Sequence, residues 1–285
     1  MKREPEFFCP EHRIYISPST FEYESDQDNI LWDHDLLNDH LKDKRESRIA
    51  RDNSEDAKTW NVFRFLENSD ILADYLTSIV DSPQSNPTTF FWSYSKEEKT
   101  GWSLLNEARI EFGETVRHGS EPDLMVLTDQ TLFFIEAKLT ATNNTAPIRK
   151  DPKYRKKYDT GADAWFSRVF KPSVEFWNLA LEQKKFELLR FWLLGTWMAN
   201  KLGRSFCLLN LVREMAEKEI KNIFGDNLAQ DESRRFRRAT WEDIYRFMGK
   251  IYVDSQVLRQ YMENKTIGYR GGKLVRAFSV QQGHT

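Results

Sequence analysis

The spacing of apolar residues becomes helical from Ser54 onward, after an opening stretch that is mostly polar. Ser54 is a residue type that caps helices. Apolar residues then recur at the three- to four-residue spacing of one helix face, at Trp60, Phe63 and Leu66. A second helix is predicted over 70–80, because Asp81-Ser82-Pro83 breaks the pattern. Residues 85–89 are predicted to form a loop.

The middle of the chain contains short apolar runs that indicate strands. Residues 104–112 favour a strand, with a helix as the alternative. Two short strands are predicted over 123–127 and 132–138, joined near Asp129-Gln130. The polar and basic segment 143–160 is predicted to be an exposed loop.

The last third of the chain alternates between helical and strand patterns. A continuous apolar run over 206–212 predicts a buried strand. Helices are predicted over 176–201, 214–223 and 255–264, and from Thr240, where Asp243 completes a capping box. Glycines 268, 271 and 272 predict a C-terminal end that is loosely packed. The resulting order, α-β-β-β-α-β, indicates an α/β fold with a mixed central sheet flanked by helices.

The composition predicts a folded protein without a membrane span. Of 285 residues, 40% are hydrophobic and 14% aromatic, which is ample for a buried core. We expect an N-terminal appendage over 1–50 and one domain over 51–285. The most apolar stretch, 186–199, contains Arg190 and is shorter than the roughly 20 residues that a membrane span needs. With only two cysteines and no apolar segment after Met1, a cytoplasmic location is expected.

Charged residues gather at one end of the predicted hairpin. Pro122-Asp123 opens its first strand, and Glu136-Ala137-Lys138 closes its second. If Asp129-Gln130 forms a two-residue turn, Asp123 lies opposite Glu136. Opposed side chains share a sheet face, with Cβ atoms about 4.5–5.5 Å apart. Lys138 lies on the same face, because it is two residues beyond Glu136.

Two carboxylates so placed destabilise a sheet unless another charge offsets theirs. A divalent cation would do so, and Mg²⁺ is commonly held by one or two carboxylates together with water and phosphate. Lys138 could then stabilise charge on a phosphate or orient an attacking water. The alternative is chance, since strand ends emerge into water and often carry charged residues.

The segment Pro122-Asp123, twelve intervening residues and then Glu136-Ala137-Lys138 resembles the PD-(D/E)XK signature of restriction-endonuclease-like nucleases. The predicted order of elements over residues 50–253 is also similar to the core of that superfamily. The resemblance implies that Asp123 and Glu136 bind Mg²⁺, for which Mn²⁺ can substitute. It also implies that Lys138 assists phosphodiester hydrolysis.

Four further residues are candidates for a supporting role. Many members of the superfamily carry another acidic residue on the preceding helix, which makes Glu55 a candidate catalytic and metal-binding residue. The alternative is a structural role, because a carboxylate at the start of a helix interacts favourably with the positive end of the helix dipole. Glu121 adjoins the motif. Gln183 and Arg190 fall on nearly one face of the predicted helix, and related nucleases place a polar residue from this helix at the site. A buried Arg190 needs an anionic partner, which would be Glu136, phosphate or, preferably, a structural carboxylate.

A basic cluster follows the proposed active strand and predicts a nucleic-acid contact. Its members are Arg149, Lys150, Lys153, Arg155, Lys156 and Lys157. Such residues neutralise phosphates, and the interleaved Tyr154 and Tyr158 could stack on bases. An ordinary solvated loop is the alternative. A second cluster, Arg234, Arg235, Arg237 and Arg238, is interpreted as a solvated face before a helix.

These patterns favour a Mg²⁺-dependent endonuclease acting on DNA, with RNA as a further substrate class and a homodimer as one assembly to test. The alternative is a catalytically inactive nuclease fold that serves as a nucleic-acid-binding or protein-interaction module. Retention of Asp123, Glu136 and Lys138 favours the enzyme.

Overall fold

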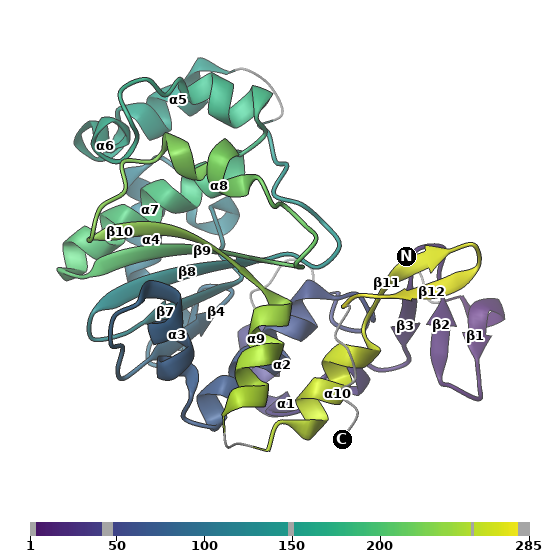
Figure 1. The fold of residues 1–285 in the computed structure, drawn as a ribbon. Helices are drawn as coiled ribbons and strands as arrows, with labels where there is room; N and C mark the ends of the chain where they lie inside the picture. The colour runs from purple at the N-terminus through teal and green to yellow at the C-terminus, as the bar shows by residue number, and fades with distance from the viewer. Residues whose placement is uncertain (1–3, 42–47, 148–150, 252–253, 279–285) are drawn as a thin grey trace.

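The computed structural model describes residues 4–41, 48–147, 151–251 and 254–278. A five-stranded sheet lies between two layers of helices (Figure 1). Its strands, in spatial order, are β10 (Arg234–Thr240), β9 (Ser205–Val212), β8 (Thr131–Ala137), β7 (Leu124–Leu127) and β4 (Thr88–Phe91). β4, β7 and β8 run antiparallel to one another, whereas β8, β9 and β10 are parallel. The protein is therefore mixed α/β, as the sequence predicts.

One face of the sheet packs against a layer that contains the first predicted helix. The helices of this layer are α2 (Glu55–Asn68), α3 (Leu72–Val80), α9 (Trp241–Lys250) and α10 (Gln256–Asn264). Trp60 and Trp241 are fully buried there. Large apolar side chains contribute about 1.5–3 kcal/mol each when they leave water, so this layer is a main source of stability. Ser54 and Thr240 cap α2 and α9 as predicted.

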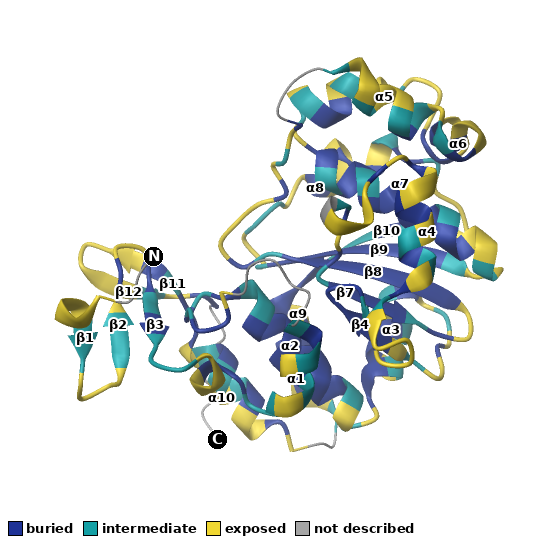
Figure 2. Ribbon diagram, turned by 180° about the vertical axis from the view of Figure 1, so that it is seen from behind, coloured by how far each residue is buried: buried dark blue, intermediate teal, exposed yellow. Residues whose placement is uncertain are grey.

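The second face carries further helices, and the central strands β8 and β9 between the layers are almost wholly buried (Figure 2). These helices are α4 (Ser103–Glu111), α5 (Pro152–Asp159), α6 (Gly161–Val169), the π-helix η4 (Asn178–Glu182), α7 (Phe186–Leu202) and α8 (Ile220–Ile223). α7 lies close to the sheet because Gly195 has no Cβ, which would stand 2.1 Å from the Phe206 ring. Within the described ranges, no helix is long and apolar enough to cross a membrane.

Both ends of the described chain meet beside the sheet layers. The N-terminal part contains α1 (His34–Leu41) and a small sheet of β1 (Phe8–Cys9), β2 (Ile14–Ile16) and β3 (Phe21–Tyr23). A C-terminal hairpin is formed by β11 (Thr266–Arg270) and β12 (Lys273–Arg276). The buried carboxylate of Asp52 ties the hairpin down, because it pairs with Lys265 Nζ at 2.9 Å and accepts two hydrogen bonds from Thr266. Ile30 and Leu37 pack into the same core as α2.

Short elements complete the fold. They are β5 (Tyr94–Ser95), β6 (Thr100–Gly101), η1 (Pro5–Phe7), η2 (Asp26–Asn29), η3 (Val116–His118) and η5 (Gly225–Asn227).

Several predicted segments were wrong. Residues 104–111 lie in helix α4, which was the alternative to the favoured strand. The third core strand is instead β4, half of which was predicted to be loop. β4 forms because it pairs with β7, and this long-range contact could not be predicted from the local sequence, in which Pro87 directly precedes the strand. The predicted loop 143–160 contains α5, which Asp151 caps by accepting from the amide of Lys153.

The arginine-rich segment is strand β10 rather than a solvated face, because its guanidinium groups find backbone acceptors. Arg235 donates to the carbonyl of Val80, and Arg238 donates to the carbonyls of Glu214 and Ala216. The glycines at 271 and 272 form the turn of the β11–β12 hairpin with positive φ, so the predicted loose end was also wrong. The helix predicted over 214–223 is shorter in the structure, where α8 covers only Ile220–Ile223.

Candidate active site

The hairpin of β7 and β8 has the predicted register. Leu127 pairs with Leu132, and Leu124 with Ile135. Asp129-Gln130 is the two-residue turn, since the amide of Thr128 donates to the carbonyl of Thr131 at 2.9 Å. The Thr128 hydroxyl also accepts from the amides of Gln130 and Thr131. This hydroxyl satisfies turn amides that Asp-Gln alone would leave to water, which explains how a weak turn sequence holds the register.

Asp123 lies at the entry to β7, opposite Glu136 by extension of that register. Its Oδ2 accepts from the amide of Ala137 at 2.8 Å. By the alternation of the strand, Glu136 shares a sheet face with Phe134, which packs in the α7 layer. The predicted meeting of the two carboxylates therefore occurs on the α7 side, at the carboxyl end of β8.

Glu136 is a buried carboxylate in an unfavourable position. It is 2% exposed, and its Oε2 has no hydrogen-bond partner among the described residues. Burial raises the pKa of Glu136 well above its usual value, and the charge of Asp123 raises it further. Lys138, whose Nζ donates to Oε1, opposes this effect. Such a group is unfavourable unless a further positive charge approaches it.

Lys138 connects this pair to helix α7. Burial alone would lower the pKa of its ammonium, but the charges of Glu136 and Asp123 hold that pKa above the usual value. Its Nζ also lies 3.7 Å from Oε2 of Glu187, in the first turn of α7. Sequence reasoning missed Glu187, although an acidic residue at the start of a long apolar helix was a visible signal.

The chain beyond Lys138 is fixed by side chains from three elements. Oε1 of Glu55 accepts from the amides of Leu139, Thr140 and Ala141, at 2.6, 3.1 and 3.3 Å. Arg213 Nε donates to the carbonyl of Leu139, and the Trp241 indole donates to the carbonyl of Lys138. Glu55 thus reaches the motif strand as a loop anchor, and its role as a metal ligand stays a prediction.

An amide on the neighbouring strand extends the polar surface. Asn210 of β9 is paired with Glu136 across the sheet and is fully buried. Its Oδ1 accepts from Asn143 Nδ2 at 2.7 Å, and its Nδ2 donates to Glu217 at 2.7 Å. Sequence reasoning missed Asn210, although an amide inside a continuous apolar strand is unusual. The three side chains hold the loop after β8 against β9.

The other candidates, Glu121, Gln183 and Arg190, differ in their surroundings. Glu121 is exposed, and its charge opposes the lowering of the Arg109 pKa that burial causes. Gln183 precedes α7, so the prediction that it shares a helix face with Arg190 was wrong. In the described part of the chain Arg190 has no carboxylate at ion-pair distance. Its guanidinium instead lies 4.8 Å from the centre of the Phe186 ring.

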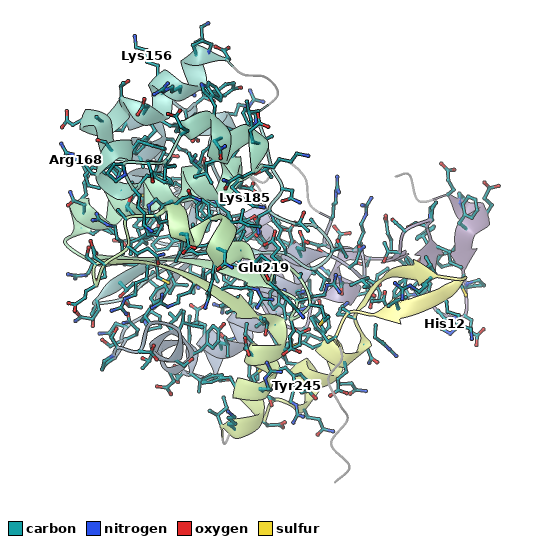
Figure 3. All side chains as sticks on the ribbon, turned by 45° about the horizontal axis from the view of Figure 1, so that its top comes forward. His12, Lys156, Arg168, Lys185, Glu219 and Tyr245 are labelled. Atoms are coloured by element: carbon teal, nitrogen blue, oxygen red, sulfur yellow. The ribbon has the colours of Figure 1, made fainter. Side chains whose placement is uncertain are left out.

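The predicted basic cluster is only partly described. Arg149 and Lys150 lie outside the described residues. Lys153 and Lys156 are exposed on α5, with Lys156 at the outer end of the molecule (Figure 3). Arg155 pairs with Asp159, and Lys157 packs its stem against Gly113. Two lysines of α5 therefore remain available to a charged partner.

The donor set at Glu136 fits a hard cation held by two carboxylates and water. The supporting observation is the buried Oε2 of Glu136, which lacks a partner and faces repulsion from Asp123. In the described residues, no three His, Cys, Asp or Glu side chains converge to hold an ion. Any ion at this place would therefore complete its coordination with water or substrate oxygens.

Comparisons with protein-family models, curated proteins and solved structures found no match to this chain.

Proposed function

We propose that this protein is a divalent-metal-dependent nuclease in which Asp123, Glu136 and Lys138 form the hydrolytic centre. The observation that carries the proposal is the buried, unpartnered Oε2 of Glu136 beside a second carboxylate and a lysine. A purely structural role would leave a carboxylate oxygen without a partner in the interior, which is costly.

The order of elements supports a restriction-endonuclease-like core within the α/β class. Helix α2 is followed by the antiparallel strands β4, β7 and β8, and then by α7 and the parallel strand β9. This matches the α-β-β-β-α-β order expected for PD-(D/E)XK nucleases. Because fold alone does not determine activity, the assignment depends on the site.

Each residue of the centre has a role that follows from its position. Asp123 and Glu136 would hold the cation, which when bound supplies Lewis-acid stabilisation of charge on the phosphate. Lys138 keeps its proton next to two carboxylates, so it would donate hydrogen bonds to a phosphate oxygen. Glu187 would hold the ammonium of Lys138 in place. The anchored backbone at 139–141 keeps Lys138 from swinging away.

The substrate class is proposed to be DNA, with RNA as the other polymer to test. Lys153 and Lys156 on α5 offer positive charge, and the whole chain has a formal net charge of -2, so binding would rest on local patches. Binding through such patches weakens steeply as salt rises, because phosphate contacts release counterions.

A cleavage assay with matched variants tests the proposal. Wild-type protein is incubated with single- and double-stranded DNA and RNA in Mg²⁺, Mn²⁺ or EDTA. We expect metal-dependent cleavage that falls about 100- to 1,000-fold in Asp123→Asn and Lys138→Met, as when a charge-stabilising group is lost. Asp129→Asn, at the opposite, exposed end of the same hairpin, is the control and should keep full activity.

Equal cleavage by wild type and Asp123→Asn would contradict the proposal. DNA binding that persists in EDTA, with no cleavage in either metal, would instead support the inactive binding module.

A further inference from the structure

A pocket of about 530 Å³ lies at the start of α7, where Lys185 of its lining is two residues before Glu187. Its volume is within the range of about 300–1,000 Å³ that is usual for sites of small ligands. One wall comes from the loop after β8 and the residues just before α7, and the other comes from α8 and η5. Its lining consists of four side-chain amides, one cation, one carboxylate and one apolar residue, namely Asn144, Gln183, Asn222, Asn227, Lys185, Asp226 and Ile223.

Lys185 supplies the positive charge of this pocket. It is 4% exposed, and its Nζ donates to Asn144 Oδ1 at 2.6 Å and to the carbonyl of Asn143 at 3.4 Å. In the described part of the chain no carboxylate lies within ion-pair distance of it. Burial lowers the pKa of Lys185, and Glu217 partly opposes that effect. A buried ammonium held only by neutral oxygens favours an anionic group nearby.

Gln183 adds a second unsatisfied group. Its Nε2 donates to Asn178 at 2.9 Å, but its Oε1 is buried and has no partner among the described residues. An amide acceptor in this state favours a ligand that brings a hydrogen-bond donor.

The pocket is joined to the hydrolytic centre by two routes. Lys185 and Glu187 are two residues apart, and Glu187 lies 3.7 Å from the ammonium of Lys138. Lys185 also donates to Asn143, whose side chain donates to Asn210, the cross-strand neighbour of Glu136. The pocket is therefore connected to the centre through Glu187 and through the pair Asn143 and Asn210.

We propose that this pocket takes one unpaired nucleotide of the strand whose phosphodiester lies at Asp123, Glu136 and Lys138. Side-chain amides offer a donor and an acceptor side by side, which matches the polar edge of a base. Enzymes that act on nucleic acid commonly extrude a base or use single strands, so that such an edge is exposed. Lys185 would complement an adjoining phosphate. This inference deepens the proposed nuclease function and rests on it.

The experiment uses a single-stranded oligonucleotide that carries one 2-aminopurine, titrated with the full chain in EDTA so that cleavage does not occur. Asn222→Trp fills the pocket from its exposed α8 wall, and Lys185→Gln removes the buried charge. Lys221→Ala, exposed on the same helix but outside the lining, is the control. We expect wild-type binding to increase 2-aminopurine fluorescence, because the base is unstacked. Asn222→Trp should bind about ten-fold more weakly, equivalent to about 1.4 kcal/mol, with no fluorescence change.

Wild-type affinity and fluorescence in both Asn222→Trp and Lys185→Gln would overturn the proposal. Free dAMP is a separate arm. If Asn222→Trp weakens the binding of dAMP but leaves the binding of the oligonucleotide unchanged, the proposal that the pocket takes a nucleotide of a nucleic-acid strand is overturned. Failure of the nuclease proposal alone is recognisable, because metal-dependent cleavage would be absent while the Asn222-dependent fluorescence response remained.

Discussion

Removal of the Glu55 carboxylate would separate its two candidate roles, anchor of the loop and ligand of the metal. Oε1 of Glu55 accepts three backbone hydrogen bonds, of which that from Leu139 is the shortest and most buried. In Glu55→Ala the amides of Thr140 and Ala141 would turn to water, since both residues are exposed. The amide of Leu139 would lose a charge-assisted bond worth about 1.5–3 kcal/mol.

The Glu55 carboxylate also lies in the first turn of α2, where its charge favours the helix dipole by about 0.3–1 kcal/mol. We therefore expect Glu55→Ala to lower the free energy of unfolding in urea by about 2–4 kcal/mol. Glu55→Gln keeps an acceptor oxygen, so it should lose only about 1 kcal/mol, close to the value of one ordinary hydrogen bond. Mn²⁺ affinity, measured by calorimetry on both variants, should change less than ten-fold. The reasoning is refuted if Glu55→Gln keeps full stability and loses Mn²⁺ binding, because Glu55 would then be a ligand.

Three further outcomes are expected. Burial lowers the pKa of His40 to about 4, so as the pH falls below 6.5 the unfolded chain binds this proton while the folded chain does not. The contribution of His40 should therefore lower the free energy of unfolding in urea by about 3 kcal/mol between pH 6.5 and 4. His40→Gln should flatten this pH dependence, and an unaltered slope would contradict the argument. Gly195→Ala should lose about 1–3 kcal/mol through collision with the Phe206 ring, whereas Gly249→Ala, with open space around it, should not destabilise; equal thermal midpoints would refute the packing argument. Glu187→Gln should reduce cleavage about ten-fold through a less well held Lys138, with folding unaffected, and an unchanged rate would remove Glu187 from the site.

The hairpin was predictable because its evidence is local. Thr128 and Thr131 flank the two-residue turn, Leu127 then pairs with Leu132, and the period-two alternation of the strands assigns every later position to a face. The meeting of Asp123 with Glu136 follows from this register alone. The Thr128 hydroxyl, which holds the turn, was not anticipated.

The outer strands of the sheet were not predictable in the same way. β4 has four residues, and its pairing with β7 is decided by segments more than thirty positions apart. β10 contains four arginines, which sequence patterns assign to a solvated surface. Only the folded chain brings carbonyls such as those of Val80 and Ala216 within reach of their guanidinium groups.

The surroundings of the site were missed for a related reason. Glu187, Asn210 and Lys185 come from α7, β9 and the turn before α7, so no motif spacing joins them to Glu136. Arg190 was expected to need a carboxylate, but the face of the Phe186 ring receives its guanidinium. Partners of this kind depend on how α7 rotates against the sheet, which the large-to-small contact at Gly195 helps to determine.

The most direct test of the central claim is a Mn²⁺ soak of crystals of the wild-type protein, with anomalous difference density measured at the hairpin. The account predicts one peak shared by the carboxylates of Asp123 and Glu136, at oxygen distances near those of hard cations, about 2.0–2.6 Å. The peak should be absent in Asp123→Asn crystals soaked in the same way. Density elsewhere, or none at the pair at saturating Mn²⁺, would contradict the claim that these two carboxylates share an ion.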